Sequence, residues 1–302
     1  MSTIEAYEKE IMMQLEYLQS FKPQQLLSSI KQRKTIFCGT GDSYASALLA
    51  EVFSQFRARS HDPLDLLKNK NLVKNHDLYL ISISGNTISN IRLGKLAKNS
   101  IAVTANNSSR LAQACKKVIP LQFENTGIQT SGSISFLASA LTCISLVSRS
   151  QIRDAMKIFG HAKKASQKIS LHGKIYILGN LHTFPIAFFF ASKIHEVLGI
   201  DAHCERIEQF SHAGLFAAKR GDTVILFEEK NPHNEKLLKH LRNCKLNDIR
   251  IDPPKTNLLG KVLFFIFVSE LIPLYVAKKK KKKECYFIEA KQLKDASSSM
   301  IY

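Results

Sequence analysis

The sequence predicts an α/β protein with parallel β-sheets, built as two similar halves. Short apolar segments of strand composition alternate with segments in which apolar residues recur at helical spacing. A strand, a glycine-containing turn and a helix follow one another from residue 35, and again from residue 174. The 302 residues are 45% hydrophobic with 13 glycines and 8 prolines, which is typical of a globular protein with a full core.

The first half begins with an amphipathic helical segment, residues 4–30, with Pro23 as a candidate boundary inside it. Four strands are expected after it, at residues 35–38, 78–83, 101–104 and 118–123. Helices are expected at residues 45–55, from residue 88, and at about 134–147. Because strands and helices alternate at short spacing, the sheet should be parallel and covered on both faces.

The second half restarts after a polar stretch, residues 148–172. Its expected strands are residues 174–178, 202–205, 223–227 and 248–251, and its expected helices are residues 184–198, 211–218, 234–243 and 258–277. The last helix is almost long enough to span a bilayer. Lys261, Glu270 and Pro273 interrupt its apolar run, so we expect a buried core helix and no membrane partner.

The formal net charge of +18 favours an anionic partner, either a sugar phosphate or a nucleic acid. The lysine run at residues 278–283 carries no interleaved aromatic residues, so a solvated connection is expected there and nucleic-acid binding is not. Six scattered cysteines and the lack of a signal-peptide pattern indicate a cytoplasmic protein with reduced thiols. No metal-ligand spacing, dinucleotide fingerprint or phosphate-binding P-loop is present, so we expect no metal and no cofactor.

Three hydroxyl-rich turns follow strands of the first half, where ligands bind in open parallel sheets. The central turn is Ser82-Ile83-Ser84-Gly85-Asn86-Thr87, between a strand and a helix. The candidate phosphate-binding residues of the three turns are Thr40, Ser43, Ser82, Ser84, Thr87, Ser131 and Ser133. Hydroxyl and backbone N–H groups at a helix N-terminus suit a phosphomonoester. The alternative is a plain strand–helix connection in which serine and threonine act as caps.

The ionisable candidates lie in the second half. Lys193 and Glu196 are three residues apart on one expected helix, a spacing that an ordinary surface pair also has. His195 and His203 are more simply explained as solvated or structurally satisfied histidines.

Residues 35–302 resemble the sugar isomerase (SIS) family, above all the isomerase part of glutamine–fructose-6-phosphate amidotransferases and then archaeal phosphoglucose/phosphomannose isomerases. The turn at residues 82–87 matches the family's phosphate-binding Ser-Gln-Ser-Gly-Glu-Thr, and Ser43 matches a serine of its first turn. The resemblance implies two tandem flavodoxin-like αβα sandwiches with parallel sheets. The implied parts are an N-terminal helical segment (1–34), a first, phosphate-binding SIS domain (35–165) and a second, catalytic one (166–302).

The catalytic residues are also implied by the resemblance. The family's Ala-x-Lys-x-x-Glu helix, here residues 191–196, places Glu196 as the base that moves a proton between C1 and C2. Sixteen residues later, His212 matches the histidine that opens the sugar ring from a neighbouring subunit, which implies a homodimer. Lys193 and a tail lysine, Lys294 in preference to Lys291, would stabilise the enediolate charge.

The implied function is aldose–ketose isomerisation of a hexose or amino-hexose 6-phosphate. The sequence departs from the amidotransferases: Ser2 follows Met1 where a glutaminase cysteine is expected, and His212 is followed by Ala213-Gly214 in place of Gly-Pro. Two alternatives therefore remain open. One is a glucosamine-6-phosphate deaminase, and the other is a non-catalytic phosphosugar-binding module, although no helix-turn-helix precedes residue 35.

Overall fold

The computed structural model describes residues 1–302, which divide into two compact units. The β1–β5 unit consists of Glu16–Thr126, Gly132–Ser150 and Ala290–Tyr302. The β6–β9 unit consists of Met1–Leu15, Gly127–Ser131 and Gln151–Glu289. The chain thus enters each unit more than once, whereas the boundaries expected from the sequence are continuous; those SIS-domain boundaries stay a prediction.

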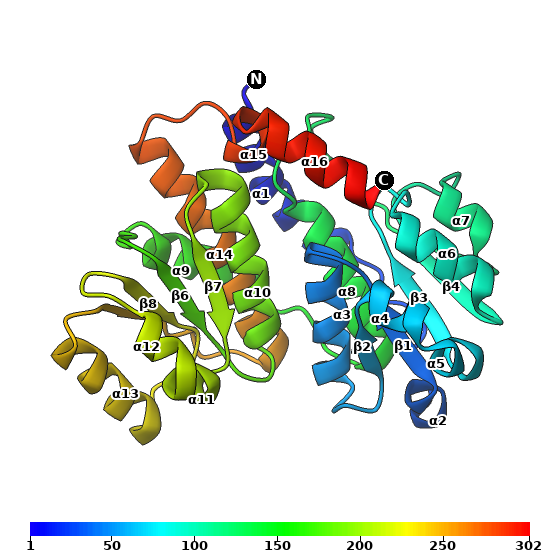
Figure 1. The fold of residues 1–302 in the computed structure, drawn as a ribbon, viewed down its shortest axis with the longest axis horizontal. Helices are drawn as coiled ribbons and strands as arrows, with labels where there is room; N and C mark the ends of the chain where they lie inside the picture. The colour runs from blue at the N-terminus through cyan, green and yellow to red at the C-terminus, as the bar shows by residue number, and fades with distance from the viewer. The chain divides into compact units, whose positions relative to one another are not determined.

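The first unit contains a five-stranded parallel sheet in the order β2-β1-β3-β4-β5 (Figure 1). Its strands are β1 (Thr35–Cys38), β2 (Arg59–His61), β3 (Asp77–Ile81), β4 (Asn99–Thr104) and β5 (Lys117–Pro120). The parallel α/β fold predicted from the sequence is confirmed. The prediction missed β2, because an edge strand of three polar, partly exposed residues carries no apolar pattern.

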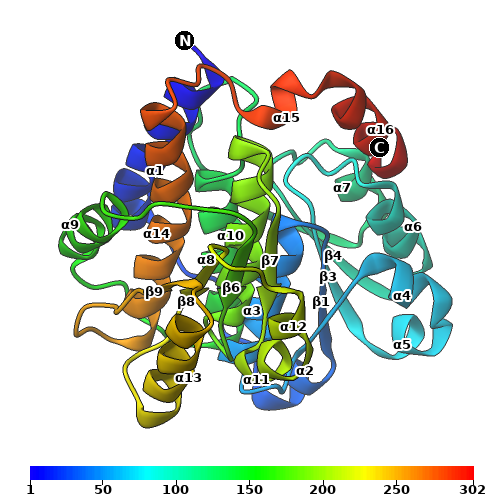
Figure 2. The same cartoon turned by 60° about the vertical axis from the view of Figure 1, so that its left-hand side comes forward.

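Helices cover both faces of this sheet (Figures 1 and 2). On one face, α3 (Asp42–Phe53) packs against α8 (Ile134–Val147), and the Ser46 and Ser139 hydroxyls lie 2.8 Å apart between them. On the other face, strand residues form a buried cluster with Leu66, Ile91 and Leu111. The remaining helices of the unit are α2 (Ser29–Arg33), α4 (Pro63–Lys68), α5 (Lys70–Asn75), α6 (Ile88–Leu96), α7 (Arg110–Ala114) and α16 (Lys291–Ile301).

The second unit contains a four-stranded parallel sheet in the order β7-β6-β8-β9. Its strands are β6 (Ile175–Leu178), β7 (Ala202–Glu205), β8 (Thr223–Leu226) and β9 (Asn247–Arg250). The first strand therefore lies between the second and the third, as in the other sheet. This is the doubly wound, flavodoxin-like order, in which the connections diverge between the first and third strands.

The helices of this unit include one that the sequence did not reveal, α9 (Ala155–Ser166), within the expected polar stretch. Ile158, Phe159 and Ala162 form its buried face, and the Phe159 ring meets Phe267 edge-on at 5.1 Å. The other elements are α1 (Thr3–Ser20), α10 (Phe184–Lys193), the π-helix η1 (Ile194–Leu198), α11 (Ile207–Gln209), the π-helix η2 (Phe210–Gly214), α12 (Leu215–Ala217), α13 (Pro232–Asn243), α14 (Leu258–Lys279) and α15 (Tyr286–Glu289).

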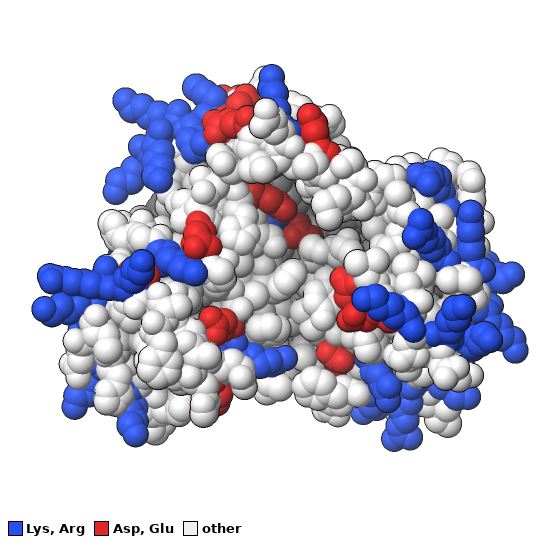
Figure 3. All heavy atoms as spheres, viewed as in Figure 1, with Lys and Arg blue, Asp and Glu red and all other residues white.

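Helix α14 is long and apolar enough to cross a membrane, but most of it is buried against other helices, as expected of a core helix. Its buried Glu270 carboxylate accepts hydrogen bonds from the Gln14 amide nitrogen at 2.8 and 2.9 Å. A buried carboxylate needs such donors because burial removes its water. Many Lys and Arg side chains project from the face shown in Figure 3. In the lysine run at the end of α14, Lys278 pairs with Glu8 and Lys282 with Glu289, while the other four lysine side chains are exposed. The Lys283 carbonyl accepts a hydrogen bond from the Ile4 N–H.

Candidate functional site

Two of the predicted turns follow neighbouring strands of the first sheet. The first runs from Gly39 to Ser43 after β1, and the second from Ser82 to Thr87 after β3. Since β1 and β3 are paired in parallel, both turns lie at the same edge, at the point where the connections diverge. Ser43 is buried in the first turn of α3, and Thr40 is partly exposed.

The Ser82–Thr87 turn is held by its own hydroxyl groups. The Ser82 and Thr87 hydroxyls are buried and lie 3.1 Å apart, and the Gly85 N–H donates to the Ser82 hydroxyl at 3.2 Å. Ser84 is exposed and its hydroxyl accepts from the Asn86 N–H at 3.3 Å. Thr87 is the N-cap of α6, but its side chain does not cap the helix. Because Thr87 does not cap α6, the first backbone N–H groups of this helix are not satisfied by its side chain. Such N–H groups can donate to a bound anion.

Only glycine fits at position 85. Its φ is +66°, in the left-handed region, and an added Cβ would lie 2.1 Å from the Ser109 hydroxyl oxygen. The Gly85 carbonyl accepts the Leu111 N–H at 2.9 Å, which fixes the turn to the start of α7. The polar turn after β4 therefore supports the candidate phosphate turn, although it was not itself predicted as part of the site.

Ser133, at the N-terminus of α8, has an unusual environment. The residue is fully buried, and its hydroxyl makes no hydrogen bond within the chain. A buried hydroxyl without a partner is costly, so this position suits a bound ligand or water.

In the second unit, Lys193 and Ser131 converge on the carboxylate of Glu196. The Lys193 ammonium and the Ser131 hydroxyl both donate to Glu196 Oε2 at 2.6 Å. Lys193 and Ser131 are buried, whereas the Glu196 side chain is 40% exposed. The other oxygen, Oε1, makes no hydrogen bond within the chain. The Ser131 hydroxyl thus already has a partner within the chain, and its expected role in phosphate binding stays a prediction.

Local structure explains how these groups are held. Lys193 ends α10 and Glu196 lies on η1, and π-helical turns are frequent at functional sites. Gly199 ends η1 with φ +68°, and an added Cβ would lie 2.5 Å from the Tyr286 ring. Next to Ser131, the Thr130 hydroxyl donates to the Thr3 carbonyl at 2.9 Å, which fixes the short segment that carries Ser131.

The other two predicted catalytic residues lie on other elements. His212 is exposed on η2 and makes no hydrogen bond with Glu196. Lys294 lies half-buried on α16, in the β1–β5 unit. Their roles remain predictions.

Comparison with solved structures shows the same fold in sugar-phosphate proteins. A glucosamine-6-phosphate deaminase from Thermotoga maritima has a TM-score of 0.71 at 18% identity, over 93% of this chain and 95% of that one. Tagatose-6-phosphate ketose/aldose isomerase from Escherichia coli has a TM-score of 0.66 at 16% identity, over 93% and 91%.

The C-terminal domain of glucosamine-fructose-6-phosphate aminotransferase from Francisella tularensis has a TM-score of 0.66 at 16% identity, over 94% of this chain and 95% of that one. No family model and no curated protein matches the sequence. The resemblance to SIS proteins inferred from short motifs is therefore matched by the fold.

Proposed function

We propose that this chain, which has the fold of SIS proteins, interconverts the aldose and ketose forms of a hexose or amino-hexose 6-phosphate. The observation that carries the proposal is the Glu196 carboxylate. Lys193 and Ser131 hold one of its oxygens, and the other is free to accept a proton. A carboxylate fixed in this way, and still partly exposed, is suited to general base catalysis.

In the proposed reaction, Glu196 Oε1 removes the proton from C2 of the open-chain aldose, or from C1 of the ketose. The electron pair forms the C1–C2 double bond of an enediolate, and the carbonyl oxygen takes the negative charge. In the aldose-to-ketose direction, O1 then takes up a proton, the O2 hydroxyl gives one up, and Glu196 returns its proton to C1, which leaves the carbonyl at C2. The reverse direction follows the same steps backwards. Lys193 is the nearest fixed cation to Glu196 and would offset negative charge that develops beside it.

The Ser82–Thr87 turn would bind the phosphate, together with Ser43 and the unpartnered hydroxyl of Ser133. This assignment separates two kinds of variant. Ser82→Ala should weaken binding and raise KM, because the turn loses the hydroxyl that Gly85 N–H and Thr87 share.

Glu196→Gln, in contrast, should abolish turnover of fructose 6-phosphate or glucosamine 6-phosphate while ligand-induced thermal stabilisation survives. An unchanged rate in Glu196→Gln would exclude Glu196 as the base. Stabilisation of the wild type by hexose phosphates without any turnover would favour the non-catalytic module instead.

We further propose a homodimer in which His212 serves the partner's site. His212 is exposed, and Phe216, four residues later, is 88% exposed. A large apolar side chain that is this exposed in a single chain is typical of a surface that another copy covers. Mixing and refolding inactive Glu196→Gln and His212→Asn chains should restore about a quarter of the activity, since half the dimers then hold one intact site of two. No recovery would indicate that His212 acts in its own chain.

Deamination of glucosamine 6-phosphate is a second candidate, because the fold is shared with a deaminase that acts on this sugar. An ammonia-coupled assay distinguishes the two reactions. Ammonia release that depends on Glu196 would favour the deaminase.

A further inference from the structure

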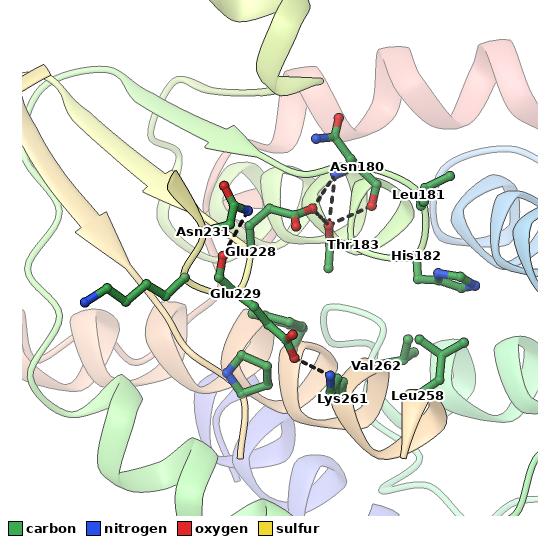
Figure 4. Close-up of a pocket in the computed structure, with 13 residues that line it drawn as sticks. Asn180, Leu181, His182, Thr183, Glu228, Glu229, Asn231, Leu258, Lys261 and Val262 are labelled. Carbon is green, nitrogen blue, oxygen red and sulfur yellow. Dashed lines mark hydrogen bonds and ion pairs between the residues drawn. The ribbon is translucent and has the colours of Figure 1, made fainter. Parts of the chain in front are cut away.

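A pocket of about 360 Å³ opens at the edge of the second sheet, beyond the carboxyl ends of β6 and β8 (Figure 4). The turn after β6 supplies Asn180 and Thr183, the end of β8 supplies Glu228, and the start of α14 supplies Leu258. In topology this is the counterpart of the place between β1 and β3 where the phosphate is proposed to bind. Its volume falls within the range of small-molecule sites.

Two donors at the start of α10 that could bind an anion, the Asn180 N–H and the Thr183 hydroxyl, already face a carboxylate of the chain. Glu228 Oε1 accepts the Asn180 N–H at 3.1 Å and lies 3.0 Å from the Thr183 hydroxyl. A carboxylate of the chain thus sits at the N-terminus of α10, where a phosphate would otherwise bind. A second anion at this place would be repelled, so the pocket disfavours phosphate.

The second carboxylate oxygen of Glu228 remains available to accept a hydrogen bond from a ligand. Glu228 Oε2 makes no hydrogen bond within the chain, and no dashed line reaches it in Figure 4. A carboxylate oxygen can only accept, so it selects hydroxyl or amine donors.

The charges around Glu228 favour an uncharged ligand. Two glutamates and two lysines line the pocket, namely Glu228, Glu229, Lys230 and Lys261, so their formal charges sum to zero. Glu229 forms an ion pair with Lys261, and Lys230 is exposed. Burial lowers the pKa of His182, so its imidazole is neutral at pH 7. The lining also includes three apolar side chains, Leu258, Val262 and Phe265, which suit the C–H face of a sugar ring.

We propose that this pocket binds an uncharged polyhydroxylated molecule of about monosaccharide size, with its hydroxyls on Glu228. The two sheets then bind different ligands. The hydroxyl-rich turns after β1 and β3 bind a phosphorylated sugar, and the turn after β6, with the carboxylate of Glu228, binds an unphosphorylated one. The second site is independent of the proposed isomerase activity.

Calorimetric titration of the full chain with uncharged hexoses and hexitols tests the proposal. At least one of them should bind saturably at a single site, and inorganic phosphate should not compete. Leu258→Trp, which fills the exposed mouth of the pocket, and Glu228→Ala, which removes the acceptor, should each weaken binding at least about tenfold.

Two matched controls should keep wild-type affinity for the uncharged ligand. Glu208→Gln changes an exposed carboxylate outside the pocket, and Ser82→Ala alters only the phosphate turn. Urea unfolding of each variant confirms that it is folded. Lack of saturation with every hexose and hexitol up to about 50 mM would overturn the proposal, because a millimolar site would be filled by then. If the uncharged ligand still binds to Leu258→Trp but no longer binds to Ser82→Ala, it occupies the phosphate turn, and the proposal is also overturned.

Discussion

Replacing Gly85 by alanine should destabilise the β1–β5 unit and weaken phosphosugar binding together. At φ +66° a side chain costs about 1–2 kcal/mol in the left-handed region. The added Cβ would also lie 2.1 Å from the hydroxyl oxygen of Ser109 and 2.4 Å from its Cβ, and such overpacking costs about 1–3 kcal/mol more. The total is about 2–5 kcal/mol of the free energy of unfolding.

Gly221→Ala is the control for this prediction. Gly221 also has a positive φ, +88°, but nothing lies within 4 Å of its added Cβ, so only the backbone cost of about 1–2 kcal/mol applies. Urea unfolding measures both losses, and fructose 6-phosphate titration measures binding. Adding Ser109→Gly to Gly85→Ala should recover most of the overlap cost, since glycine replaces an N-cap serine at a few tenths of a kcal/mol. If Gly85→Ala costs no more than Gly221→Ala, the close packing of the turn on Ser109 is refuted.

Three further predictions concern the second unit. Glu196→Leu should destabilise the chain by about 1–3 kcal/mol in urea unfolding, because the buried Lys193 ammonium loses a hydrogen-bond acceptor. Lys193→Met should cost less stability while losing activity, because the Glu196 side chain is 40% exposed and can be hydrated. Ser131→Ala should lower stability by about 1–2 kcal/mol and reduce kcat, measured by steady-state kinetics, because Glu196 loses an orienting donor. Burial lowers the pKa of His182 from 6.5, so stability should fall as the pH drops below that value, and His182→Asn should flatten the fall in urea midpoint.

Each of these predictions has a contradicting outcome. Equal losses in Glu196→Leu and Lys193→Met would show that the lysine charge does not need this carboxylate. Wild-type kcat in Ser131→Ala would leave the serine without a role in orienting the base. An identical pH dependence of stability in wild type and His182→Asn would indicate that another group is responsible.

Much of the fold could be predicted because its periodic signals are strong. The expected helix at 134–147 and the expected strand at 202–205 are observed as α8 and β7 with the same ends. Both are bounded by clear changes in composition. In α9, by contrast, only three of the twelve residues are buried apolar side chains, and lysines lie on either side of them, so the apolar stripe is too narrow to recognise in the sequence.

The residues of the candidate site could be proposed from the sequence, and their roles stay predictions, but the contacts between them could not be foreseen. Ser131 and Glu196 are 65 positions apart, and nothing in residue spacing indicates that a serine from one turn will reach the end of a distant helix. The π-helical geometry of η1 likewise has no sequence pattern of its own. The pocket at Glu228 was missed because a lone glutamate after a strand is an ordinary surface residue until the structure shows its donors.

The role of Glu196 as the base is tested most directly by solvent deuterium. The wild-type protein, incubated with hexose 6-phosphates in D₂O and followed by NMR, should exchange the C2 proton of the aldose and a C1 proton of the ketose. Glu196→Gln should bind the same sugars and exchange neither proton. Exchange at the wild-type rate in Glu196→Gln would contradict the assignment of Glu196 as the base.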